Sequence, residues 1–125
     1  MKQLILAAVL ASAFAYTAFA QEGAKGPNGG PVVETHDVFV EMTVEDDNLV
    51  LHFAGEDGKV IPSDGTTKAR AIVQDAGKTT TVALETQAPN RLVGALSGPL
   101  GPGARVVVSA TLADGHAIQA RFVNN

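Results

Sequence analysis

Histidine is the residue type in this sequence best suited to chemistry, because a neutral imidazole is the commonest protein ligand for zinc, copper and nickel. The chain has three histidines, each close to an acidic residue in the sequence or across a predicted hairpin. We predict a metal site formed by His36, His52 and His116, with Glu34, Asp37 and Glu41 as supporting carboxylates. No His-x-His or His-x-x-x-His spacing is present, so the site forms only if distant segments converge in the fold.

A second interpretation of the histidines needs no metal. His52 then makes an ordinary cross-strand pair with Glu41, a contact worth less than about 1 kcal/mol. His116 then caps the end of an apolar stripe, and His36 is solvated. The sequence alone leaves both interpretations open.

The composition excludes several other classes of protein. The chain has 125 residues, enough for one domain, and no cysteine, which rules out disulfides, thiolate zinc sites and a cysteine nucleophile. Its net charge is −4 at pH 7 and it has no basic run, which argues against nucleic-acid binding. We find no Gly-x-Ser-x-Gly motif, phosphate-binding loop or paired acid–base carboxylates, so we predict that the protein is not an enzyme.

The first twenty residues have the layout of a secretory signal peptide. Lys2 gives a positive start, residues 4–15 are almost entirely apolar, and Ala18-Phe19-Ala20 is a small-x-small cleavage site. We therefore predict export to the periplasm, with cleavage after Ala20. The alternative is a transmembrane anchor, because the apolar run to about Ala20 is near the lower length for a span. No positive stop-transfer segment follows and the cleavage site is well formed, so we expect no membrane span after signal cleavage.

The mature sequence divides into a leader and one domain. Residues 21–31 contain four glycines and two prolines and are predicted to form a flexible leader. From Val32 onward, alternating apolar runs are separated by Asp, Asn, Gly and Pro clusters roughly every ten residues, and no window carries a helical stripe. We predict that residues 32–125 form an all-β, two-sheet antiparallel sandwich of about seven strands with immunoglobulin-like topology, and a small barrel is the alternative.

The first long hairpin can be given a register from its apolar alternation. A four-residue loop at residues 45–48 pairs Val40 with Phe53, so that the large apolar side chains share one face. On the other face, this register places Glu41 directly across from His52.

The last hairpin has a similarly clear register. A three-residue loop at residues 113–115 pairs Ala110 with Ile118, and Gly115 then takes a left-handed backbone conformation. The same register puts His116 at the end of the core-facing stripe.

Several short motifs together resemble a known class of periplasmic β-domain. They are Gly26-Pro27-Asn28-Gly29-Gly30-Pro31, Phe39-Val40-Glu41, Asp57-Gly58-Lys59, Gly103-Ala104-Arg105 and Asp114-Gly115-His116. With these motifs the chain resembles the amino-terminal region of heavy-metal efflux adaptor proteins, the periplasmic membrane-fusion subunits of metal export pumps, here as a stand-alone exported protein. The resemblance implies a link to metal export and an envelope efflux component as partner.

Two functions are consistent with these observations. The first is a non-enzymatic exported β-sandwich that binds copper, zinc or nickel in connection with metal efflux. The alternative is a metal-free periplasmic module that docks another envelope protein. Its docking surface would be the outer sheet face that holds Arg105, Thr111 and Arg121.

Overall fold

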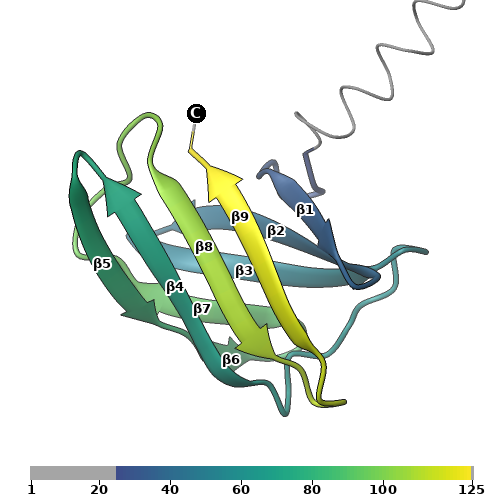
Figure 1. The fold of residues 1–125 in the computed structure, drawn as a ribbon. Coiled ribbons are helices and arrows are strands. Elements are labelled where there is room, and N and C mark those ends of the chain that lie inside the picture. The colour runs from purple at the N-terminus through teal and green to yellow at the C-terminus, as the bar shows by residue number, and fades with distance from the viewer. Residues whose placement is uncertain (1–24, 125) are drawn as a thin grey trace, which may run out of the picture.

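The computed structural model describes residues 25–124, which form nine β-strands and no helix. The predicted signal peptide and the first residues of the predicted leader lie outside the described residues. The strands form two antiparallel sheets packed face to face (Figure 1). The predicted all-β, two-sheet antiparallel sandwich is therefore confirmed. Across residues 25–124, no helix with the length and hydropathy of a membrane span occurs.

The five-stranded sheet has the order β1-β2-β3-β7-β6, and the four-stranded sheet has the order β5-β4-β8-β9. The first sheet consists of β1 (Val32–Thr35), β2 (Val38–Glu45), β3 (Asn48–Gly55), β7 (Arg91–Ala95) and β6 (Glu85–Gln87). The second consists of β5 (Lys78–Ala83), β4 (Thr67–Asp75), β8 (Arg105–Thr111) and β9 (Ala117–Val123). The described residues hold more strands than the predicted seven or so. The reason is that β1 and β6, with 4 and 3 residues, are too short to give an alternation signal.

The core lies between the two sheets and consists of aliphatic side chains and two phenylalanines. Its members occupy alternate positions along the strands, which is why the sequence periodicity predicts strands. Most of the positions between them are exposed or half-buried, and the exceptions are Glu41 in β2 and Val50 in β3, which are also buried. The core members are Val38, Val40, Met42, Leu49, Leu51, Phe53, Ala71, Val73, Val82, Leu84, Leu92, Val106, Val108, Ala110, Leu112, Ile118, Ala120 and Phe122. Val44 continues the same stripe in sequence but is 47% exposed, next to the hairpin tip.

Strands β2 and β3 pair in the predicted register, including Glu41 opposite His52. The loop is shorter than predicted, because Glu45 still pairs with Asn48. Only residues 46–47 remain in the loop, and their φ angles are 49° and 66°. Two consecutive residues at positive φ are typical of the type I′ turn, whose twist matches that of the flanking strands.

Strands β8 and β9 also pair as predicted, with Ala110 opposite Ile118. The backbone N–H of Leu112 donates to the carbonyl of His116 at 2.8 Å, and Gly115 has φ +92°. The prediction fails only for the side chain of His116, which is 66% exposed instead of ending the core stripe. Its imidazole turns back toward the loop residue Asp114 instead.

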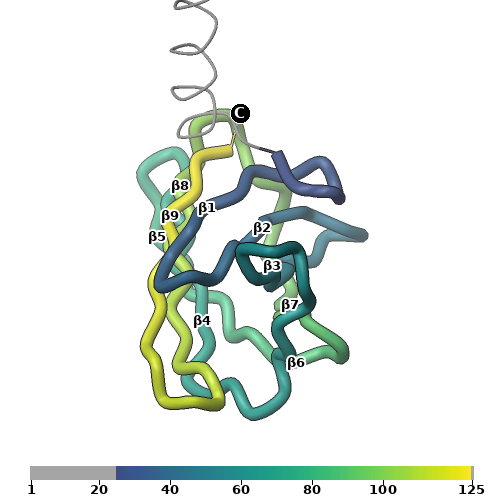
Figure 2. The backbone as a smooth tube through the Cα atoms, turned by 90° about the vertical axis from the view of Figure 1, so that its right-hand side faces the viewer, coloured from purple at the N-terminus to yellow at the C-terminus, as the bar shows by residue number. Residues whose placement is uncertain are grey.

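The sides of the sandwich are closed in two different ways. On one side, β5 pairs with β4 and β6 pairs with β7, so the chain crosses between the sheets at the buried residue Leu84. On the other side, β1 lies along β9 of the opposite sheet (Figure 2). This second contact brings the turn between β1 and β2 toward the turn between β8 and β9.

Candidate metal centre

Two of the three predicted histidine ligands lie beside each other. The ring centroids of His36, in the β1–β2 turn, and His116, after the β8–β9 turn, are 6.2 Å apart with planes inclined by 27°. Two imidazoles that share one zinc ion have ring centres within about 6 Å of each other, because each Zn–N bond is about 2 Å long. The observed separation is therefore at the upper end of what a shared ion allows.

A carboxylate fixes the orientation of His116. Its ring nitrogen Nδ1 lies 2.8 Å from Oδ2 of Asp114, and its backbone N–H donates to Oδ1 at 3.0 Å. These two contacts, the backbone one first, hold the pKa of the Asp114 carboxyl below its usual range. A carboxylate on one ring nitrogen is the usual way in which a metal-binding histidine is oriented, and it directs Nε2 toward a ligand.

Three exposed carboxylates meet beside His36. Glu34 of β1, Asp37 of the β1–β2 turn and Glu56 of the turn after β3 each contribute one oxygen, and these oxygens lie within 4.8 Å of one another. Asp37 follows His36 directly in the same two-residue turn, which links this carboxylate group to the histidine pair through the chain. Among the described residues, neither His36 nor His116 belongs to the group whose ligand atoms lie within 4.8 Å of one another. We call the set of His36, His116, Glu34, Asp37 and Glu56 the turn site.

The carboxylates of the turn site repel one another. The pKa of the Glu56 carboxyl lies above its ordinary value, chiefly because of the nearby Asp37 carboxylate and in addition because of Glu34. Like charges at this separation disfavour full ionisation, and either a shared proton or a bound cation relieves the repulsion. The cluster is therefore an electrostatic environment that attracts cations near neutral pH.

Glu41 does not support a histidine ligand, although it is paired with His52 in register. Its carboxylate is buried and accepts hydrogen bonds from the backbone N–H of Gly30 at 2.8 Å and from Asn28. Within the predicted leader, Asn28 and Gly30 bond to Glu41, and the carbonyl of Pro31 accepts a hydrogen bond from the backbone N–H of Met42 at 3.0 Å. Glycine is required at position 30, because a Cβ there would overlap the backbone carbonyl of Met42.

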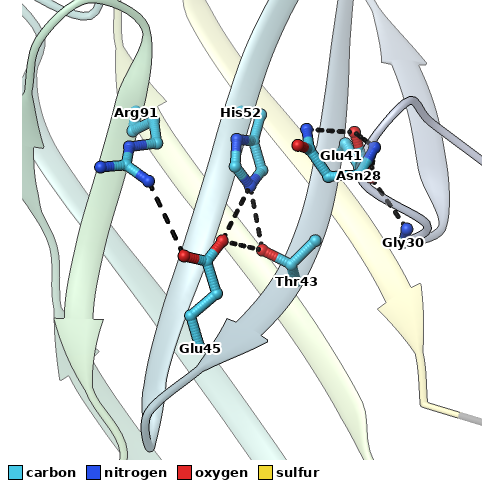
Figure 3. A network of polar contacts seen from close by, with 7 residues as sticks. All are labelled: Asn28, Gly30, Glu41, Thr43, Glu45, His52 and Arg91. Carbon is cyan, nitrogen blue, oxygen red and sulfur yellow. Dashed lines mark hydrogen bonds and ion pairs between the residues drawn. The ribbon is translucent and has the colours of Figure 1, made fainter.

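His52 belongs to a separate network on the outer face of the five-stranded sheet (Figure 3). Its Nε2 lies 2.9 Å from the Thr43 hydroxyl and 3.7 Å from Oε2 of Glu45. The other carboxylate oxygen of Glu45, Oε1, lies 3.8 Å from Nη1 of Arg91. The His52 side chain is only 12% exposed. The acidic partner of His52 is therefore Glu45 and not the predicted Glu41.

The structure thus brings four of the six predicted site residues to one end of the sandwich and leaves His52 and Glu41 elsewhere on the β2–β3 hairpin. Sequence reasoning missed Glu56, although a signal for it existed. Glu34 pairs with Phe39, which pairs with Ala54. Glu56 lies two residues beyond Ala54 and so shares its face.

The fold and the turn site together define a class: a two-sheet β-sandwich with an acidic, histidine-bearing turn region at one end. Comparisons with protein-family models, with curated proteins and with solved structures find no match to this chain.

Proposed function

We propose that the protein is a non-enzymatic exported β-sandwich that binds a divalent transition metal ion at the turn site. The observation that carries the proposal is a group of three carboxylates within 4.8 Å of one another whose member Asp37 follows His36, one of two histidine rings 6.2 Å apart. Imidazole nitrogen together with carboxylate oxygen suits zinc, copper and nickel, whereas an all-oxygen site favours magnesium or calcium. The exposure of every member favours a site that takes up and releases its ion, rather than a closed structural site.

The proposed setting is the periplasm, with a role in metal efflux. The signal-peptide layout of residues 1–20 supports export, and the resemblance of the motifs to efflux adaptor proteins supports a link to metal export. In that role the protein buffers the ion or delivers it to an envelope efflux component. No step of this role requires a nucleophile or an acid–base pair.

Titration calorimetry of the mature protein with zinc, copper(II) and nickel tests the proposal. The double substitution His36→Ala and His116→Ala removes both nitrogen ligands, and we expect it to weaken binding at least 10-fold for the preferred ion. The matched control is His52→Ala, which removes an imidazole outside the turn site and leaves affinity within about two-fold. Equal affinity of the double variant and the unaltered protein would overturn the proposal.

We further propose that the sandwich is immunoglobulin-like in topology. The strand order supports this, because β2-β3-β7-β6 and β5-β4-β8-β9 correspond to A-B-E-D and C′-C-F-G when the strands are lettered in chain order. Strand β1 is an addition at the edge of the first sheet, next to strand A. In this arrangement the turn site is formed by the added strand with the turn that follows it, the turn after strand B and the F–G turn.

A further inference from the structure

The two sheets differ in charge. The strands of the four-stranded sheet carry five cationic side chains and one carboxylate, whereas those of the five-stranded sheet carry four carboxylates and one arginine. The whole chain has a net charge of −4. The cations are therefore gathered on one layer of an otherwise acidic protein.

Three arginines of the four-stranded sheet point away from the core. Arg70, Arg105 and Arg121 are exposed, and the residues on either side of each along the strand are buried or half-buried. In register, Arg70 lies beside Ser109, and Arg121 lies beside Val107. We call this outer surface of β4, β8 and β9 the arginine face.

The arginine face is not neutralised by the protein itself. In the part of the chain that the structure describes, no carboxylate lies within 4.0 Å of the guanidinium groups of Arg70, Arg105 or Arg121. Asp75, the single carboxylate in the strands described for this sheet, accepts a hydrogen bond from the backbone N–H of Gly101 at 2.8 Å. Asp75 is the last residue of β4, at the opposite end of the strand from Lys68 and Arg70.

A groove of about 670 Å³ hollows one end of the arginine face. Lys68 and Arg70 supply its positive charge, and the side chains of Ser109, Thr111 and Gln119 supply neutral hydrogen-bond donors. This combination of charged and neutral donors matches a ligand made of carboxylates. The guanidinium group adds geometric selection, because its planar fork binds a carboxylate through two parallel hydrogen bonds.

We propose that the arginine face docks a carboxylate-rich segment of another protein. Charge complementarity identifies the partner: an acidic chain is attracted to this face and repelled by the rest of the molecule, which fixes the orientation of binding. A membrane surface is a poorer match, because interfacial binding requires several large apolar side chains. Among the described residues, Val123 is the single large hydrophobic side chain that is exposed at the arginine face. The groove also borders His36 of the turn site, but the docking itself requires no metal.

Fluorescence anisotropy with a labelled hexaglutamate peptide, in chelator and at low salt, tests the docking. We expect hexaglutamate to bind at least 10-fold more tightly than hexaglutamine, and its affinity to fall steeply as salt rises from about 50 to 200 mM. Replacing Arg70, Arg105 and Arg121 by glutamine should weaken binding at least 10-fold. The control Lys25→Gln with Lys59→Gln removes exposed charges outside the arginine face and should leave affinity within about two-fold.

Several results would overturn the docking proposal. They are equal affinity for hexaglutamine, equal losses in the arginine and lysine variants, or binding to phosphatidylglycerol vesicles without binding to the peptide. Self-association that the arginine substitutions abolish, measured by light scattering, would identify a second copy as the occupant instead. If the triple variant fails to fold, the single substitutions Arg70→Gln and Arg121→Gln are each expected to weaken peptide binding several-fold.

Discussion

Glu41 binds Asn28 twice: the Asn28 backbone N–H donates to Oε2 at 3.0 Å, and the Asn28 side-chain amide donates to Oε1 at 3.0 Å. Together with the bond from Gly30, these contacts join the amino-terminal turn to the middle of β2. The carboxylate is buried, and its interactions with protein donors replace those with water. Glu41 is therefore a structural residue that fixes the segment ahead of β1.

Glu41→Gln should destabilise the protein by about 2 kcal/mol. The substitution weakens the charge-assisted hydrogen bonds to the carboxylate, and it places the amide NH₂ of the glutamine against the N–H donors of Asn28 and Gly30. Chemical unfolding in chelator measures this change. Glu45→Gln is the control, since it removes an exposed carboxylate from the same strand and should cost less than about 1 kcal/mol. Equal losses in the two variants would contradict the role assigned to Glu41.

Glu56→Gln should raise the melting temperature at pH 7 and weaken metal binding. Asp37 and Glu34 raise the pKa of the Glu56 carboxyl in the folded protein. Glu56 therefore contributes favourably to the free energy of unfolding below the carboxyl pKa of the unfolded chain, and this contribution is lost as pH rises through the folded pKa. The stabilising effect of the substitution should therefore shrink toward pH 4. Melting curves across this range measure it, with Asp64→Asn as an exposed control of equal charge change.

Asp114→Asn should reduce zinc affinity about 10-fold, because the carboxylate that orients His116 is lost. The lowered pKa of Asp114 gives a second, pH-dependent effect. The Asp114 carboxylate stabilises the folded protein above the unfolded carboxyl pKa of about 4, and this stabilisation disappears as pH falls through the pKa of Asp114 in the folded protein. Variant and unaltered protein should thus differ in melting temperature at pH 7 and converge near pH 2. Unchanged zinc affinity would show that Asp114 does not position a ligand.

Gly94→Ala should destabilise the protein by about 1–3 kcal/mol through overpacking. A Cβ at this position in β7 would lie 2.5 Å from the carbonyl oxygen of Ala83 and 2.6 Å from Cγ1 of Val82, where the chain crosses between the sheets. Gly98→Ala is the control, because its Cβ would meet nothing within 4 Å. Chemical unfolding should place the control within about 0.5 kcal/mol of the unaltered protein.

Much of the fold could be predicted because the two main hairpins separate apolar from polar residues so clearly. A one-residue shift would bury the outward-facing residues, so the pairings of Ala110 with Ile118 and of Glu41 with His52 followed from alternation. The crossing at Leu84 was not predicted, because a strand that changes sheets keeps its alternation. Alternation is also silent on which outward-facing residues become covered by another segment, which is why the burial of Glu41 was missed.

The candidate site could be predicted only in its components. His36, Asp37 and Glu34 are close in sequence, so their grouping needed no tertiary information. The approach of His116 depends on β1 lying along β9, a contact between different sheets that leaves no periodic signal. His52 could not be excluded beforehand, because its partner Glu45 lies diagonally across the hairpin and not directly opposite.

The turn between β1 and β2 places His36 and Asp37 at φ 49° and 64°. A two-residue turn of this kind is most stable with Asn-Gly, because glycine adopts positive φ without steric cost. Laboratory evolution for heat resistance alone should therefore drift toward Asn-Gly at this pair and erase an imidazole and a carboxylate together. Selection under metal stress should keep both residues, so the two evolved populations would diverge at a dipeptide that contributes nothing to the hydrophobic core.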